Sequence, residues 1–252
     1  MADDKSISAI GAPVFSAADA TNPPLPSQSD NDARKAAIRV PAPTAASDGA
    51  LVANLTRLVN GVYGEAEGTI YKTAFERTSA PQIEAYLRAG ELAVAFLRST
   101  DDDDDDDDDD DGNHEKVDSR SSAPEGITTP TPRGKKLVVV VGCVFVKKLS
   151  PTTGGFGMLA VDPTYRGTGL GRDLVRFAEE RCRRDLGLAV VRLELLVPMH
   201  FEHVGKARLQ AWYTRLGYVM TGLHDFGETH PRLNAALAGP TEYRIFEKRL
   251  VA

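Results

Sequence analysis

The sequence contains few cysteines, few aromatic residues and no long apolar run. Its 252 residues include two cysteines, Cys143 and Cys182, too few for a disulfide framework or a four-thiolate zinc site. No stretch approaches the roughly 18 consecutive apolar residues of a membrane-spanning helix. The first residues, MADDK, are not a basic segment followed by an apolar core, so no secretory signal is predicted. We therefore expect a cytoplasmic protein that binds no membrane, with a nuclear location left open.

The acidic net charge comes from a single tract. The formal charge is −6, but residues 101–111 are eleven consecutive aspartates, and without them the charge is +5. Adjacent carboxylates repel one another and have no apolar face to bury, so we predict a solvated loop here. A tail that binds cations or a basic partner is the alternative, but the aspartates lack the spacing of a calcium loop.

Composition divides the chain into one domain with two disordered segments. Residues 1–36 are rich in Ala, Ser, Asp, Asn and Pro and carry few large apolar side chains, which predicts a disordered tail. Residues 37–252 are predicted to form one domain, interrupted by a disordered Asp-rich insertion at 99–134. A short strand at 37–40, a helix capped by Asp48, a helix from Pro81 to about Gly90 and a buried strand at 92–97 are expected before the insertion.

The second half has a denser pattern of strands and helices. Apolar runs predict strands at 136–146 and 156–161, joined by a hairpin loop at 151–155. An amphipathic helix is expected from Leu170 to Leu186, then a strand at 188–197 and a helix at 204–216 ending at Gly217. Strands at 218–226 and 241–250 complete the order. We predict an α/β (α+β) fold with one mixed sheet of about seven strands and about four flanking helices.

A glycine-rich loop between the strand at 156–161 and the helix at Leu170 is the feature that points to chemistry. It reads Arg166-Gly-Thr-Gly-Leu-Gly-Arg172. Glycines allow several backbone N–H groups to face one point, and a helix N-terminus adds unpaired N–H groups and a partial positive charge. The loop therefore predicts a site for a diphosphate or a similar anion. The loop lacks the spacing of a dinucleotide fingerprint and the Gly-Lys-Ser/Thr ending of an NTPase loop. The remaining alternative is a glycine-rich turn that binds no ligand.

This loop resembles the (Gln/Arg)-x-x-Gly-x-(Gly/Ala) signature of the GCN5-related N-acetyltransferases, the GNAT superfamily. A second stretch, Trp212-Tyr-Thr-Arg-Leu-Gly-Tyr218, is similar to the end of that family's fourth helix, and one strand separates the two motifs. The resemblance covers residues 92–250, and residues 37–90 fit as the family's first strand and two helices. It implies an enzyme of class EC 2.3.1.- that transfers an acetyl group from acetyl-CoA.

The resemblance also implies where acetyl-CoA binds. It would lie where the strands at 156–161 and 188–197 separate, with its pantetheine arm on the backbone of Leu159 and Val161. An amide near Leu159 or Ala160 would polarise the thioester carbonyl. The residues expected to bind the pyrophosphate and its surroundings are Arg166, Gly167, Thr168, Gly169, Leu170, Gly171 and Arg172.

Three residues are expected to serve catalysis. By resemblance, Tyr213 would donate to the departing CoA thiolate; packing as a core aromatic beside Trp212 is the alternative. An amine of pKa about 10 is mostly protonated at neutral pH, so a group must accept a proton. Glu194 and His200 are the candidates, with Glu202, His203 and His224 close by in the sequence. No metal site is predicted, because residues 199–203 offer no third ligand.

The acceptor is less well defined by the sequence. Residues 133–252 carry 19 Lys/Arg and 11 Asp/Glu, a net charge of +8, which suits a polyanionic cofactor. Nucleic acid is not expected, since no basic helix or aromatic-interleaved patch is present. We expect a small-molecule amine, with residues 226–239 as a wall of its site. A protein lysine or N-terminus, or a catalytically silent CoA-binding module, are the alternatives.

One position departs from the family pattern. Many members have an asparagine seven residues before the helix tyrosine, where this chain has Lys206. A lysine at this position could instead contact a CoA phosphate.

Overall fold

The computed structural model describes residues 36–97 and 139–250. The tail predicted at 1–36, apart from Ala36, and the insertion predicted at 99–134 lie outside these residues, and the domain boundaries stay a prediction. No helix within the described segments is long and apolar enough to cross a membrane.

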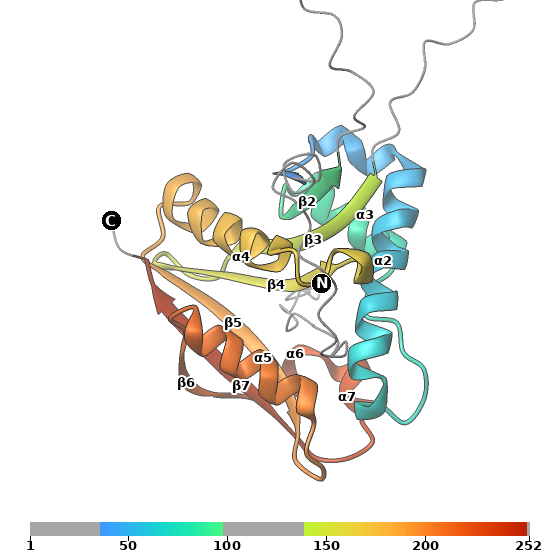
Figure 1. The fold of residues 1–252 in the computed structure, drawn as a ribbon, viewed down its shortest axis with the longest axis vertical. Coiled ribbons are helices and arrows are strands. Elements are labelled where there is room, and N and C mark those ends of the chain that lie inside the picture. The colour runs from blue at the N-terminus through green and yellow to red at the C-terminus, as the bar shows by residue number, and fades with distance from the viewer. Residues whose placement is uncertain (1–35, 98–138, 251–252) are drawn as a thin grey trace, which may run out of the picture.

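The described segments form seven strands and six α-helices in one α/β domain (Figure 1). The helices are α2 (Gly49–Glu67), α3 (Ala80–Arg88), α4 (Leu170–Glu180), α5 (Val204–Arg215), α6 (Phe226–Thr229) and α7 (Pro231–Ala235). The strands are β1 (Ala37–Arg39), β2 (Leu92–Leu97), β3 (Val139–Lys148), β4 (Thr153–Val161), β5 (Val190–Pro198), β6 (Val219–His224) and β7 (Thr241–Arg249). The predicted mixed sheet of seven strands is confirmed. The two short helices α6 and α7 were not predicted.

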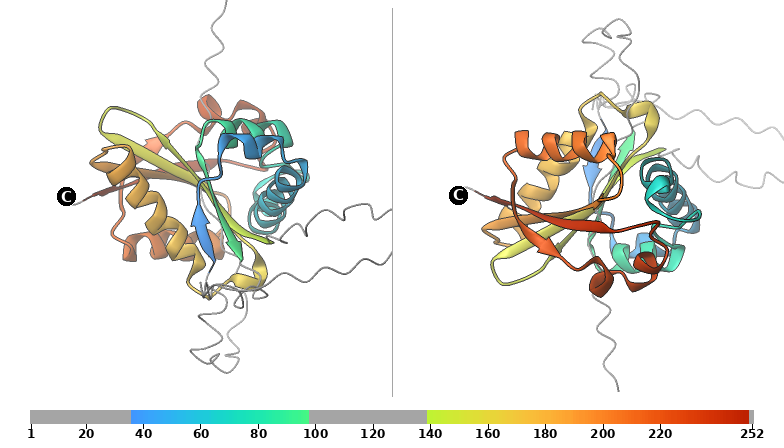
Figure 2. Two further views of the ribbon diagram at one scale, coloured as in Figure 1. Left: turned by 90° about the horizontal axis from the view of Figure 1, so that it is seen from above. Right: turned by 90° about the horizontal axis from the view of Figure 1, so that it is seen from below.

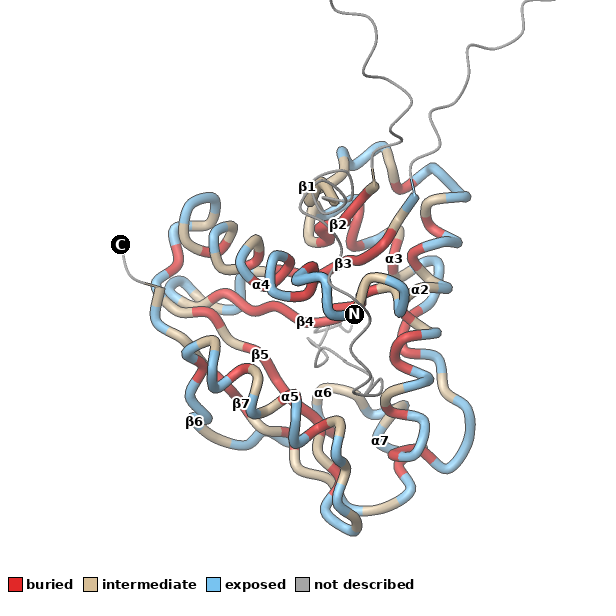
Figure 3. The backbone as a smooth tube through the Cα atoms, in the orientation of Figure 1, coloured by how far each residue is buried: buried red, intermediate tan, exposed pale blue. Residues whose placement is uncertain are grey.

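All seven strands belong to one sheet with the order β1-β2-β3-β4-β5-β7-β6. Neighbouring strands are antiparallel except β4 and β5, which are parallel. Helices α2 and α3 cover one face, and α4 and α5 cover the other (Figure 2). Buried residues follow β2 to β5 and β7, whereas the edge strand β6 is largely exposed (Figure 3).

Local sequence signals account for the main elements. The Asp48 carboxylate accepts from the N–H groups of Ala50 and Leu51, which caps α2 as predicted. The turn that follows α4 packs closely on the sheet at Gly154, where a Cβ atom would lie 2.5 Å from the Cys182 sulfur. The helix predicted to continue to Leu186 changes to a π-helical turn over Arg181–Asp185, with Cys182 buried in it.

The connection between β6 and β7 is folded against the α2–α3 connection. Its chain forms α6 and α7, and Leu237 makes an isolated antiparallel bridge with Tyr71. The Lys72 N–H donates to the Ala236 carbonyl, and the Ala238 N–H donates to Ile70. A cluster of buried apolar residues fills the space beneath, so the two connections form one wall.

Candidate functional site

The parallel strands β4 and β5 pair only where they begin. Their register joins Thr153–Gly155 to Val190–Arg192, and no further pairing is recorded between them. β4 continues to Val161, while β5 pairs with β7 along its whole length to Pro198. The two strands therefore diverge (Figure 1), as predicted from the family resemblance. Beyond Gly155, the edge of β4 that faces β5 pairs with no strand in the described residues.

A β-bulge lies in β4 beside this divergence. Cys143 pairs with Ala160 and Phe145 with Gly157, so two residues of β4, Met158 and Leu159, stand opposite one of β3. Met158 has φ +46°, a left-handed conformation that is uncommon outside glycine and costs about 1–3 kcal/mol. The strained backbone thus lies next to Leu159 and Ala160, where the oxyanion-binding amide was expected. Nothing in the sequence signalled the bulge, because methionine has no preference for this conformation.

The glycine loop leaves its amides without internal partners. Gly167 and Gly169 have φ of +81° and +96°, and a Cβ atom at either would meet nothing within 4 Å. Arg166 donates its N–H to the Pro163 carbonyl, and among the described residues no backbone acceptor is recorded for the N–H groups of residues 167–172. Helix α4 starts at Leu170, with Gly169 as its N-cap. Backbone N–H groups without a backbone acceptor at a helix N-terminus are the property that suits an anion.

The two arginines flanking the loop differ in their environment. The Arg166 guanidinium forms a bidentate ion pair with Glu65 of α2, at 2.9 and 2.7 Å. Glu65 therefore neutralises the charge of Arg166, and the ion pair holds the loop against α2. Arg172 is exposed on the first turn of α4. Of the two arginines expected at the pyrophosphate, Arg166 is thus paired with Glu65, and Arg172 is the one with an exposed side chain.

Tyr213 lies on the inner face of α5 with its side chain fully buried. Its ring packs against Trp212, Phe156 and Tyr218 with centroids 4.8–6.3 Å apart. Within the described residues, its hydroxyl has no hydrogen-bond partner. Burial raises the pKa of this phenol well above its ordinary value, so it stays protonated. A buried hydroxyl without a partner is costly, and a ligand atom would satisfy it.

Glu194 lies in the middle of β5, where it is 7% exposed. One carboxylate oxygen is 2.9 Å from the Nδ1 atom of His224 on β6. Tyr243 of β7 also hydrogen-bonds to Glu194. The pKa of the Tyr243 phenol is raised well above its ordinary value, mainly by burial and secondly by the charge of the Glu194 carboxylate. Glu194 is therefore a buried carboxylate with two polar partners, whereas the nearby Arg192 binds Glu247.

The structure does not bring His200 to the other two predicted catalytic residues. His200 is exposed in the bend after β5, where its ring packs on Phe201 and against Gly239. His203 caps α5: its Nδ1 accepts from the Lys206 N–H, and its Nε2 lies 3.1 Å from the Ala66 carbonyl. Burial lowers the pKa of His203, which suits a neutral ring held at both nitrogens. Of the candidate bases, Glu194 and His224 are the two that the structure places together.

Helices α2 and α5 are tied together by a buried ion pair. The Lys206 ammonium bonds to the Glu67 carboxylate, and both side chains are at most 4% exposed. The suggestion that Lys206 contacts a CoA phosphate is therefore wrong, because its charge is already held by Glu67. Sequence inspection could not reveal this pair, since 139 residues separate its members.

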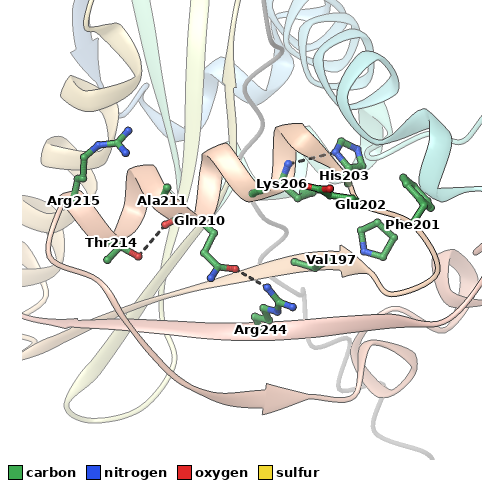
Figure 4. A pocket seen from close by; sticks show the side chains of 12 residues that line it. Val197, Phe201, Glu202, His203, Lys206, Gln210, Ala211, Thr214, Arg215 and Arg244 are labelled. Carbon is green, nitrogen blue, oxygen red and sulfur yellow. Dashed lines mark hydrogen bonds between the residues drawn. The ribbon is translucent and has the colours of Figure 1, made fainter.

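Two grooves open on the described surface. One of about 540 Å³ runs along α5 and is bordered by Val197, Phe201 and Arg244 (Figure 4). Its main polar groups satisfy each other, since Arg244 bonds to Gln210 at 2.6 Å and to Glu242 at 2.7 Å. A second groove of about 650 Å³ lies between α2 and the residues around Pro163. Neither is lined by residues 166–172 or by Tyr213.

Comparison with known proteins gives a family match within the second half of the chain and several similar solved structures. Residues 133–220 match the family model described as "Acetyltransferase (GNAT) domain". No curated protein matches. The solved structures that are similar include Rv2747 from Mycobacterium tuberculosis in complex with CoA and NLQ, at 17% identity over 85% of this chain and 99% of that one, with a TM-score of 0.44. Ard1 from Thermoplasma volcanium has 14% identity over 86% and 99%, with a TM-score of 0.47.

A third similar structure is an aminoglycoside 6'-N-acetyltransferase complexed with coenzyme A, at 14% identity over 81% of this chain and 93% of that one, with a TM-score of 0.47. The family match covers the glycine loop and the whole of α5. Residues 133–220, about a third of the chain, are therefore similar to a GNAT acetyltransferase domain. In the part of the chain that the structure describes, no three His, Cys, Asp or Glu side chains gather as a metal site.

Proposed function

We propose that the protein transfers the acetyl group of acetyl-CoA to a small-molecule amine by direct attack within a ternary complex. The observation that carries this proposal is the divergence of β4 and β5. The loop that follows β4 has backbone amides without a backbone acceptor among the described residues, and the Tyr213 hydroxyl on α5 has no hydrogen-bond partner there. These groups fit acetyl-CoA: an anion site for its pyrophosphate, unpaired strand backbone for its pantetheine arm, and a donor for its sulfur.

Acetyl-CoA supplies the acetyl group as a thioester. In the proposed reaction Glu194, oriented by His224 and Tyr243, accepts the proton of the incoming amine directly or through water. The amide of Leu159 or Ala160, set by the bulge at Met158, donates to the carbonyl oxygen as the nitrogen–carbon bond forms. Tyr213 donates to the sulfur as the carbon–sulfur bond breaks.

The wall beside Glu194 favours a small acceptor over a protein segment. Helices α6 and α7 close this side of the sheet and are fastened to the α2–α3 connection by backbone hydrogen bonds. Phe226, His230 and Tyr243 enclose a small cavity there. A peptide would need an open groove along the sheet, whereas a small amine needs only a pocket.

A panel of amines provides the direct test. The full chain is mixed with acetyl-CoA and each amine, and release of the free CoA thiol is followed with a thiol reagent. The proposal expects turnover with at least one small amine. Turnover with peptides alone would make the protein a peptide acetyltransferase. CoA binding without turnover on any amine or peptide would instead indicate a catalytically silent module.

Tyr213→Phe tests the donor to the sulfur. We expect kcat to fall about tenfold or more while the CoA dissociation constant stays within about twofold, because the hydroxyl matters when charge develops on sulfur. The melting temperature should not fall, since the hydroxyl has no partner in the described residues. Tyr218→Phe is the matched control: its buried hydroxyl bonds Glu179 at 2.8 Å, so it should lower stability and spare kcat. Equal kcat in wild type and Tyr213→Phe would remove Tyr213 from the mechanism.

Glu194→Gln tests the proton acceptor. The amide keeps the shape and a hydrogen bond but is not basic, so we expect kcat/KM to fall about 100-fold at neutral pH. The deficit should shrink as the pH approaches the pKa of the amine, about 10, because the acceptor then loses its proton to solvent. Glu247→Gln, on the next strand and paired with Arg192, is the control and should leave the pH profile unchanged. A deficit that stays constant with pH would contradict the role of a base.

A further inference from the structure

The ion pair between Arg166 and Glu65 joins the glycine loop to a helix that is remote in the sequence. Both terminal nitrogens of the Arg166 guanidinium donate to the Glu65 carboxylate, at 2.9 and 2.7 Å, from a position 101 residues away. The arginine side chain is 12% exposed and the glutamate side chain 44%. A contact through two parallel hydrogen bonds fixes direction as well as distance. Arg166 is therefore held in one orientation against α2, beside which the turn after β4 lies (Figure 1).

Helix α2 is a rigid support for this contact. One face of its 19 residues is buried on the sheet, where Leu55, Val59 and Val62 are each at most 2% exposed. Val62 lies three residues before Glu65, so the buried face extends to the turn that carries the ion pair. A helix that is packed along one whole face has little freedom to shift, and it gives the Glu65 carboxylate a fixed starting point.

The chain that leads into the loop is anchored up to Arg166. A 3-10 turn over Pro163–Tyr165 is capped by the Asp162 carboxylate, which accepts from an N–H group of the turn at 2.9 Å. The Arg166 N–H donates to the Pro163 carbonyl at 3.2 Å. After Arg166, no backbone acceptor is recorded among the described residues for the N–H groups of residues 167–172. Arg166 is thus the point from which the proposed anion-binding amides extend.

The conformation of this stretch should affect the affinity for an anion. Gly167 and Gly169 have positive φ, and glycine loses more conformational freedom than any other residue when its backbone is fixed. A ligand that has to order a loop loses that free energy from its binding, whereas a loop that is already fixed binds more tightly. The ion pair fixes the residue directly before Gly167, so it reduces the freedom that CoA would have to remove.

From these contacts we infer that Glu65 is a positioning residue for CoA: through Arg166 it holds the glycine loop in the conformation that binds the pyrophosphate. This inference rests on the proposed function, because it concerns the same anion site. It also changes the expected role of Arg166. A guanidinium whose two terminal nitrogens bind Glu65 is a structural link to α2, and the phosphates are left to the backbone amides.

Glu65→Gln tests the inference through the sign of its effect. The substitution removes a negative charge near the proposed pyrophosphate site and releases Arg166, and both changes would tighten CoA binding if charge alone decided it. If Glu65 positions the loop, calorimetric titration of the full chain should instead show CoA binding about five- to tenfold more weakly. The KM for acetyl-CoA should rise by a similar factor, while kcat at saturation changes by less than about twofold.

An exchange of the two charges separates a structural link from a direct phosphate contact. Arg166→Glu alone places two carboxylates together and should weaken CoA binding by more than about tenfold under either role. Glu65→Arg combined with Arg166→Glu recreates the ion pair with reversed polarity, and it should recover about fivefold or more of that loss. If Arg166 bound the phosphates itself, the double variant would bind CoA as weakly as Arg166→Glu, and the inference would be wrong.

Glu84→Gln is the matched control, because Glu84 pairs with Arg88 at 2.8 Å within α3. It should leave CoA affinity unchanged. Arg166→Lys keeps the charge but loses the two parallel hydrogen bonds, so it should also weaken CoA binding, and it serves as the test if Glu65→Gln does not fold. A wild-type chain that does not bind CoA would refute the proposed function. Wild-type binding with equal or higher affinity in Glu65→Gln would overturn this inference alone.

Discussion

Gly169→Glu should weaken CoA binding about a thousandfold, the largest effect on function that the structure predicts. Gly169 is the N-cap of α4 and has φ +96°, so any side chain there is strained even though the space around it is open. Glutamate would also place a carboxylate at the amides of residues 167–172. Like charges repel, so the site would lose both its shape and its affinity for a pyrophosphate. Calorimetric titration with CoA provides the measurement.

The chain offers a matched control for this substitution. Gly187, after the π-helical turn, also has positive φ (+64°) and open space around it. Gly187→Glu therefore introduces the same charge and a similar backbone strain away from the loop. Its CoA affinity should remain near that of wild type while its stability falls by a similar amount. If both variants bind CoA equally well, the loop is not the anion site, and the main support for the proposed function is lost.

The fold was predictable to the extent that its signals are local. Alternating apolar runs, the cap at Asp48 and the glycine at 217 each act within a few residues, and the elements they predicted are present. Helices α6 and α7 were missed because each is shorter than two turns and depends on packing against the α2–α3 connection. The π-helical turn was missed because residues 181–185 continue the apolar spacing of α4.

The candidate site was predictable only where it coincides with a motif. The glycine loop was predicted from its sequence, Tyr213 from the family resemblance, and Glu194 from the anomaly of a carboxylate in an apolar strand; their roles stay predictions. The partners that set the chemistry of each group, such as Glu65 for Arg166, come from distant parts of the chain.

The pair Lys206–Glu67 is the clearest such case, and it predicts the largest effect on stability. Lys206→Met should lower the free energy of unfolding by about 3–5 kcal/mol, because it leaves the Glu67 carboxylate buried without a counter-charge. Glu67→Met alone should cost a similar amount. The double variant should recover most of the loss, since two apolar side chains of similar volume remove both buried charges. Denaturant unfolding with a constant m-value measures each free energy.

Two comparisons make this cycle decisive. Arg88→Met removes a partner of the exposed Arg88–Glu84 pair on α3, and it should change stability by less than about 1 kcal/mol because water screens that pair. If Lys206→Met also lowered the free energy of unfolding by less than about 1 kcal/mol, Lys206 and Glu67 would be solvated in solution. Recovery in the double variant should also restore CoA binding, because α5, which carries Tyr213, is also held at α2 by the contact between His203 Nε2 and the Ala66 carbonyl. Restored stability with lost activity would instead show that the ion pair orients α5 for catalysis.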